Sequence, residues 1–187
     1  MVVELLVTHP VTFKIVKPRK TKLGDFRVNS RTEKPQITVN GDLNKYSFLI
    51  TTLHEFAHLI NFKENGPYVA AHGQEWKDIY SNLILPTIES KKLPEDIETA
   101  LLNSLINVKA SSCSDVNLNR TLIRYDEKNE EQDTLESLDK NSIFDLNGRL
   151  FRKGNLRRTR FYCTEIDSNK GYLVHGLAQV KEIKDGK

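Results

Sequence analysis

The sequence predicts an α+β fold in which a domain of strands and helices precedes a small antiparallel β unit. Short runs over residues 11–42 alternate apolar and polar side chains, and this period of two is typical of strands. Apolar residues then recur at helical spacing over 45–62, 74–85 and 94–108. Strand-like runs return over 143–184, where Asn147-Gly148 is a strong signal for a two-residue hairpin turn.

The helix predicted over 45–62 has a recognisable beginning, apolar face and end. Asn44 or Ser47 can cap its first turn, and Gly66-Pro67 marks where it stops. Its apolar stripe would bury the helix against a core. The stripe consists of Leu49, Leu53, Phe56, Ala57 and Ile60.

The same helix carries an H-E-x-x-H motif, formed by His54, Glu55 and His58. A helix places residues four apart on one face, so the two imidazoles can aim at one point. One histidine would be ordinary on an amphipathic helix, whereas two at this spacing with Glu55 between them favour a metal site. Glu55 is close enough to reach a metal-bound water without being a ligand.

A third ligand would leave one tetrahedral position open, which is the arrangement of a catalytic zinc rather than a structural one. The metzincin pattern requires histidine at position 64 and glycine at 61; Glu64 and Asn61 exclude that class. Glu64 and Glu75 both remain candidates, because sites with two histidines and one glutamate exist. His72 is favoured, since a loop with glycine and proline precedes it and Gly73 permits a close approach.

The stretches L-H-E-F-A-H-L and H-G-Q-E-W-K, with the strands before them, resemble the SprT-like zinc metallopeptidase family. The resemblance covers about residues 10–90 by motif and context. It implies a zincin-like metallopeptidase domain that binds Zn²⁺. Its metal ligands fall on His54, His58 and His72, and its catalytic glutamate on Glu55.

The C-terminal part of the chain departs from that family, which often carries a zinc ribbon with paired C-x-x-C motifs. Only Cys113 and Cys163 are present and neither belongs to such a motif, so a four-cysteine zinc site is impossible. The predicted organisation is a SprT-like domain, a polar and acidic connector, and a small basic, degenerate zinc-ribbon-like β unit. Their ranges are 1–108, 109–142 and 143–187.

The charges are segregated along the chain although the formal net charge is only +3. One basic cluster lies among the N-terminal strands: Lys14, Lys17, Arg19, Lys20, Lys22, Arg27 and Arg31. A second lies in the C-terminal unit: Arg149, Arg152, Lys153, Arg157, Arg158 and Arg160. Acidic residues gather over 126–139.

Aromatic residues are interleaved with the second basic cluster, namely Phe151, Phe161 and Tyr162. Such a mixture is typical of nucleic-acid surfaces, where cations contact phosphates and aromatic rings stack on bases. It is equally typical of a solvated basic strand edge whose aromatic rings lie in the core. Both interpretations stay open at the level of sequence.

Composition limits the remaining classes. No segment approaches the roughly 18 apolar residues of a membrane helix, and we expect no membrane partner. The apolar start of the chain lacks a basic region before it and a small-residue cleavage site, so we expect a short helix stopped by Pro10 rather than a signal peptide. Two cysteines without a pairing pattern are typical of a cytoplasmic protein.

Two functions follow as hypotheses. The first is a zinc-dependent endopeptidase that acts on protein substrates, with Glu55 as the general base. The resemblance to the SprT-like family implies that these substrates include proteins bound to DNA. The second is a nucleic-acid-binding or transcription-associated module whose zinc is structural or vestigial, which the two basic clusters motivate.

Overall fold

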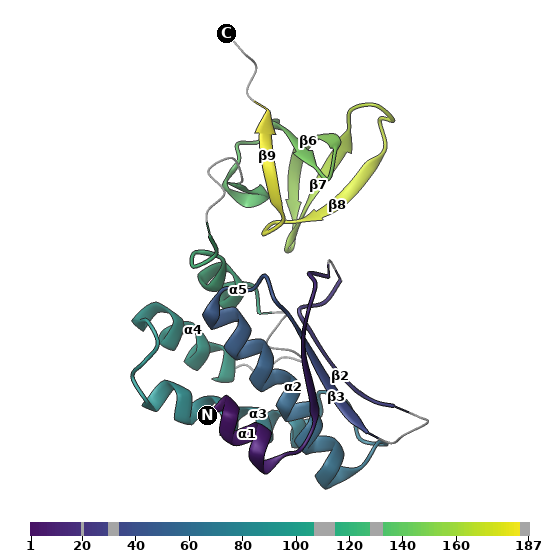
Figure 1. Ribbon diagram of the computed structural model, residues 1–187. Coiled ribbons are helices and arrows are strands. Elements are labelled where there is room, and N and C mark those ends of the chain that lie inside the picture. The colour runs from purple at the N-terminus through teal and green to yellow at the C-terminus, as the bar shows by residue number, and fades with distance from the viewer. Residues whose placement is uncertain (20, 30–33, 107–114, 128–132, 184–187) are drawn as a thin grey trace. The chain divides into compact units, whose positions relative to one another are not determined.

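The computed structural model describes residues 1–19, 21–29, 34–106, 115–127 and 133–183. It has helices and two sheets, which confirms the predicted α+β class (Figure 1). The chain divides into two compact units, Met1–Asp126 and Glu127–Lys187. No helix in the described part of the chain is both long and apolar enough to cross a membrane.

The sheet of the first unit has three strands in the order β1-β3-β2. These are β1 (Thr12–Val16), β2 (Gly24–Val28) and β3 (Pro35–Asn40). β1 runs parallel and β2 antiparallel to the central β3. Ile37 and Val39 of β3 are fully buried in the core shared with the helices. The alternate positions Gln36, Thr38 and Asn40 therefore point to the other face of the sheet.

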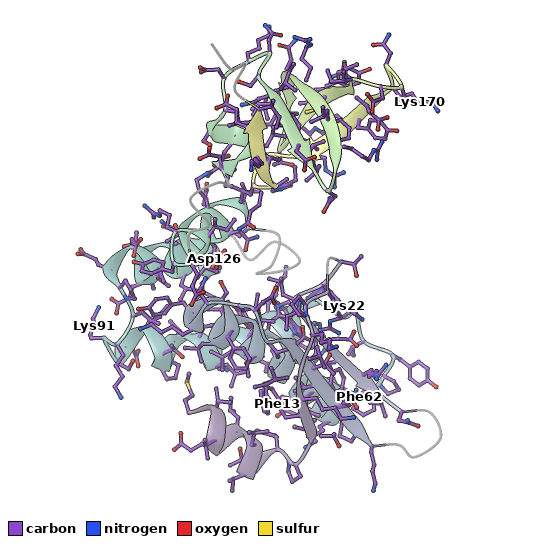
Figure 2. The ribbon with its side chains drawn as sticks, turned by 45° about the horizontal axis from the view of Figure 1, so that its top comes forward. Phe13, Lys22, Phe62, Lys91, Asp126 and Lys170 are labelled. Atoms are coloured by element: carbon purple, nitrogen blue, oxygen red, sulfur yellow. The ribbon has the colours of Figure 1, made fainter. Side chains whose placement is uncertain are left out.

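The helices of this unit are α1 (Val2–Thr8), α2 (Lys45–Asn65), α3 (Gln74–Glu89), α4 (Glu95–Ile106) and α5 (Val116–Ile123). α2 is the central one, because Leu53, Phe56 and Leu59 are fully buried. Phe13 from β1 packs against the same core (Figure 2). The short N-terminal helix before Pro10 is confirmed.

The cap of α2 settles one alternative left by the sequence. The Asn44 side chain accepts hydrogen bonds from the backbone of Tyr46 and Ser47, so Asn44 is the cap. At the other end Gly66 has a φ of 79°, a left-handed conformation that favours glycine. The helix therefore ends where Gly66-Pro67 predicts.

The predicted connector over 109–142 differs from the structure. Residues 107–114 and 128–132, and Cys113 with them, lie outside the described residues. Between these gaps, α5 buries Leu118 and Leu122 in the core of the first unit. This unit therefore extends beyond residue 108, to Asp126 (Figure 2). α5 has only eight residues, fewer than the roughly 11 over which helical periodicity can be recognised in a sequence. The acidic residues that follow it make the segment look like a polar connector.

The second unit is a six-stranded antiparallel sheet in the order β4-β9-β5-β6-β7-β8. Its strands are β4 (Asp133–Thr134), β5 (Ile143–Leu146), β6 (Arg149–Arg157), β7 (Arg160–Glu165), β8 (Gly171–His175) and β9 (Gln179–Ile183), with the short 3-10 helix η2 (Leu135–Ser137). Positive φ angles of 57° at Asn147 and 80° at Gly148 form the predicted tight turn. Leu135, Phe144 and Cys163 are fully buried in a separate core.

Candidate metal centre

Three imidazoles converge between α2 and the segment that leads into α3. His54 and His58 lie one turn apart on α2, and His72 lies two residues before α3 begins. Their ligand atoms all lie within 4.8 Å of one another. Among the described residues, these three histidines are the group of side chains that can hold a metal ion.

The separations between the ring nitrogens suit a tetrahedral ion. Nε2 of His54 lies 3.1 Å from Nε2 of His58 and 3.3 Å from Nε2 of His72. Two nitrogens bound to one tetrahedral zinc at about 2.05 Å would be roughly 3.3 Å apart. Both separations from His54 therefore match the spacing of nitrogens that share one metal ion.

All three histidines favour their neutral form. Burial lowers the pKa of His54 to about 3 and that of His58 to about 4, and the neighbouring histidines add to both effects. Burial also lowers the pKa of His72. A neutral imidazole keeps a lone pair for coordination, so the cluster is ready to bind a cation at neutral pH.

Aromatic residues form the wall behind the imidazoles. The Trp76 ring lies 4.7 Å from the rings of His54 and His72 and 5.3 Å from that of His58, measured between centroids. On another side Phe26 of β2 stacks almost parallel to His58, at 6.5 Å and 7°. These contacts fix the orientations of the rings that must point at one ion.

Glu55 is buried on the side of α2 that faces the start of β2. Its side chain is only 6% exposed and hydrogen-bonds to the backbone of Phe26. Burial raises the pKa of Glu55 to about 8, and the nearby charge of Asp25 contributes, while the Phe26 hydrogen bond opposes the rise. A carboxyl with a pKa near neutrality can both accept and release a proton.

Gly24 leaves the space that Glu55 occupies. A Cβ atom at Gly24 would stand 2.5 Å from Oε1 of Glu55 and 2.7 Å from Cγ2 of Thr51. Both separations are too short for non-bonded atoms. Any larger residue at this position would therefore push the Glu55 carboxylate or the strand away.

The two acidic alternatives for the third ligand lie outside the cluster. Glu64 and Glu75 are both exposed, and neither belongs to the group of atoms that could share an ion. Glu75 lies in the first turn of α3, where a negative charge is favourable. The arrangement of the described residues favours His72.

The basic residues proposed for nucleic-acid binding in the second unit are separated by the structure. Lys153 is 4% exposed, and its ammonium donates hydrogen bonds to the carbonyl oxygens of Glu136 and Leu138. Arg149 forms an ion pair with Glu165 at 2.6 Å. Neither side chain is a free cation, because each already has protein partners.

The other four side chains of that cluster are exposed: Arg152, Arg157, Arg158 and Arg160. Arg157 and Arg160 are cross-strand partners near the β6–β7 turn, where Arg158 has a φ of 60°. The Arg157 guanidinium lies 5.1 Å from the ring centre of Tyr162, which is 41% exposed. Phe151, in contrast, is buried in the core.

Sequence reasoning missed the contributions of β2 to this site. Phe26 and Gly24 belong to a strand that precedes the motif by about thirty residues, and no local pattern links them to His58 or Glu55. A glycine at the start of a strand is a weak hint of a close approach.

Comparison with known proteins adds no relative: no family model, curated protein or solved structure matches this chain.

Proposed function

We propose that this protein is a zinc-dependent endopeptidase of the SprT-like type, with a zincin-like first unit. The observation that carries the proposal is the convergence of three neutral imidazoles, with the buried carboxyl of Glu55 next to one of them in the chain. A His₃ set leaves the fourth tetrahedral position to a water or a substrate.

Each residue of the site has its own role in the proposed hydrolysis. His54, His58 and His72 would hold zinc, which supplies Lewis-acid activation of a water molecule and of a peptide carbonyl. Glu55 accepts a proton from the attacking water and delivers it to the leaving amine. Phe26 holds the Glu55 carboxylate through its backbone, and Gly24 leaves room for it.

The position of β2 supports a polypeptide substrate. In the described residues β2 pairs with β3 on one side only, so it forms an edge of its sheet. Phe26 of this edge contacts both His58 and Glu55. An extended peptide that adds to such an edge would pass beside the histidines.

The test is the cleavage of fluorescein-labelled casein by the zinc-loaded full chain. We expect the wild type to produce fragments that a chelator abolishes. Glu55→Gln should keep its zinc and lose cleavage by about 10²- to 10⁴-fold, the usual contribution of a general base. Glu64→Gln is the matched control on the same helix, and it should cleave like the wild type because Glu64 is exposed.

Two results would contradict this proposal. Cleavage by Glu55→Gln at the wild-type rate would remove Glu55 from the mechanism. Absence of fragments from casein and from the chain itself, with zinc bound at one ion per chain, would favour a structural or vestigial zinc.

The second candidate, a nucleic-acid-binding or transcription-associated module, is favoured by one observation in the second unit. Arg157 lies against the exposed Tyr162, and exposed Arg152 and Arg160 belong to the same two strands. Arginine beside an accessible aromatic ring suits a single strand, whose bases stack while its phosphates meet cations. Firm binding of a single-stranded oligonucleotide, lost in Tyr162→Ala, together with no peptidase activity, would support it.

A further inference from the structure

The face of the first unit's sheet that is turned away from its core carries a second arrangement of charged residues, distinct from the metal centre. Strand register sets two rows across this face. One row contains Lys14, Thr38 and Asp25, and the next contains Thr12, Gln36 and Arg27. The core-facing neighbours in the same strands include Phe13, Phe26 and Ile37.

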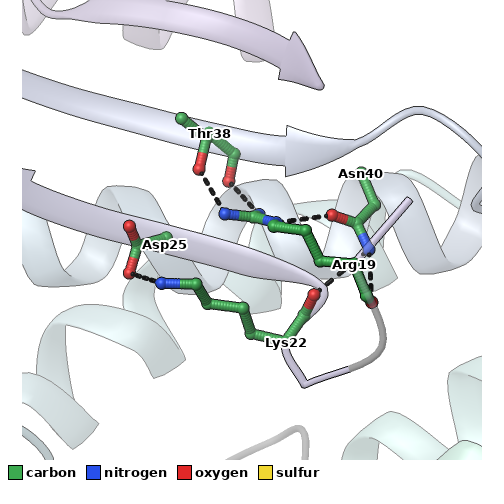
Figure 3. A network of polar contacts seen from close by, with 5 residues as sticks. All are labelled: Arg19, Lys22, Asp25, Thr38 and Asn40. Carbon is green, nitrogen blue, oxygen red and sulfur yellow. Dashed lines mark hydrogen bonds and ion pairs between the residues drawn. The ribbon is translucent and has the colours of Figure 1, made fainter. Parts of the chain in front are cut away.

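Part of this face is already occupied by a network of polar side chains. Arg19 reaches back over the central strand and donates hydrogen bonds to Oδ1 of Asn40 at 2.9 Å and Oγ1 of Thr38 at 3.0 Å (Figure 3). Lys22 pairs with Asp25 at 2.8 Å. The negative charge of Asp25, the acid in these rows, is therefore balanced by Lys22. The hydrogen bonds hold the Arg19 guanidinium in place.

The rest of the face forms an open groove of about 470 Å³. Its lining comprises Thr12, Lys14, Arg27, Val28, Asn29, Lys34 and Gln36. Lys14, Arg27 and Lys34 are exposed, and no ion pair joins them to another described residue. Among the described residues, three cations, a hydroxyl and two amides thus surround one hollow, and none of these lining residues is acidic.

The lining shows which kind of anion suits the groove. A small cofactor would need an apolar pocket around it, and Val28 is the one apolar residue in the described part of the lining. A peptide partner would need aromatic or aliphatic anchors, and its carboxylates would form only weak surface ion pairs. A nucleic acid differs, because binding to its phosphates releases condensed counterions and so needs no apolar anchor.

The absence of an aromatic side chain from this lining also distinguishes between forms of nucleic acid. Single-strand sites typically stack bases on aromatic rings, and none of the described lining residues carries one. A duplex presents its phosphates on the outside and requires only cations and hydrogen-bond donors. We infer that this groove binds the phosphodiester backbone of double-stranded nucleic acid without reading its sequence.

Binding of a duplex in this groove is independent of the proposed peptidase activity. None of the groove residues belongs to the histidine cluster, and Lys14, Arg27 and Gln36 point to the face opposite the core that holds α2. A binding measurement therefore tests the groove whether or not the chain cleaves protein.

The experiment measures fluorescence anisotropy of a labelled 20-base-pair duplex of arbitrary sequence with the full chain, over a series of salt concentrations. The groove variant combines Lys14→Gln, Arg27→Gln and Lys34→Gln. Its matched control combines Lys45→Gln, Lys63→Gln and Lys92→Gln, three exposed cations on or beside the helices of the same unit. Both variants remove three positive charges, so the net charge is equal in the two.

We expect salt-dependent binding by the wild type and by the control. For three lost phosphate contacts, the slope of log K against log salt should become shallower by about 2.7 in the groove variant. Its affinity at low salt should fall at least tenfold.

Three results would overturn the inference. Equal weakening by both triple variants would mean a bulk charge effect. Wild-type binding by the groove variant, with loss in Arg152→Gln/Arg157→Gln/Arg160→Gln, would assign nucleic-acid binding to the second unit alone. Displacement of the duplex by a 20-residue polyglutamate at equal concentration would identify an acidic polypeptide as the ligand.

Discussion

The histidine cluster and the C-terminal basic cluster were both predicted from short runs of sequence, yet the structure treats them differently. It brings the ligand atoms of His54, His58 and His72 within 4.8 Å of one another. It divides the basic cluster, since Lys153 is buried while its neighbour Arg152 is exposed.

The difference follows from the periods of the two secondary structures. A helix returns to the same face after four residues, so H-E-x-x-H fixes the relative position of two imidazoles in advance. A strand alternates faces, so adjacent cations must point in opposite directions. A dense run of basic residues on a strand therefore overstates the charge available to a partner.

The largest expected effect concerns the ligand that comes from outside the helix. We expect His72→Ala to weaken zinc binding by 100-fold or more, because even outer-shell partners of a metal contribute about 10- to 100-fold. Titration with zinc, followed by the fluorescence of Trp76, the chain's only tryptophan, measures this directly. Glu75→Gln should bind zinc like the wild type; the reverse result would make Glu75 the third ligand.

A matched pair of substitutions on β6 tests the division of the basic cluster. Lys153→Met leaves the carbonyls of Glu136 and Leu138 without this donor and should destabilise the second unit by about 1–3 kcal/mol. Arg152→Met should stay within about 0.5 kcal/mol of the wild type, as exposed substitutions usually do. Hydrogen exchange of peptides from residues 143–183 measures both, and equal protection in the two variants would contradict the assignment.

Gly24 tests how far the surroundings of Glu55 are fixed by packing. Gly24→Ala forces a methyl group against the carboxylate, and overpacking of this kind costs about 1–3 kcal/mol. We expect casein cleavage to fall while zinc content stays at the wild-type level. Gly41→Ala is the control, since its added Cβ would meet Ile15 rather than Glu55; an equal loss of cleavage there would point to general destabilisation.

The smallest expected effect concerns the ion pair between Arg149 and Glu165. The hydrogen bond from Arg149, helped by Ser168, lowers the pKa of Glu165 from 4.5 to about 2. A carboxylate whose pKa is lowered by folding stabilises the fold above about pH 4.5 and loses that contribution as the pH falls towards 2. Glu165→Gln should remove this part of the acid sensitivity of the second unit, measured by hydrogen exchange between pH 5 and 2.5. An unchanged dependence of hydrogen exchange on pH would mean that the ion pair between Arg149 and Glu165 does not stabilise the second unit.

Much of the fold was predictable from local patterns. The α2 boundaries, the Asn147-Gly148 turn and the antiparallel second sheet all follow from periodicity and turn chemistry. α5 was not predicted, because an eight-residue helix among polar residues leaves little periodic signal. Its existence depends on burying Leu118 and Leu122 in a distant core.

The candidate site was predictable where spacing alone determines geometry. The helix places His54 and His58 on one face, and the loop between them and His72 is short enough to fold back towards that face. The roles of Phe26 and Gly24 depend on how β2 pairs with β3 and packs on α2, which is long-range information. The groove on the sheet could not be predicted for the same reason. Lys34 lies beside Lys14 and Arg27 only because β1 and β2 both pair with β3.

The most direct test of the metal centre is the amount of zinc bound per chain, measured by mass spectrometry of the metal after dialysis. The wild type and His9→Ala, a histidine of the same unit outside the cluster, should each retain one ion per chain. His58→Ala should retain none. Zinc-free wild-type protein after exposure to excess zinc, or full occupancy in His58→Ala, would contradict the account.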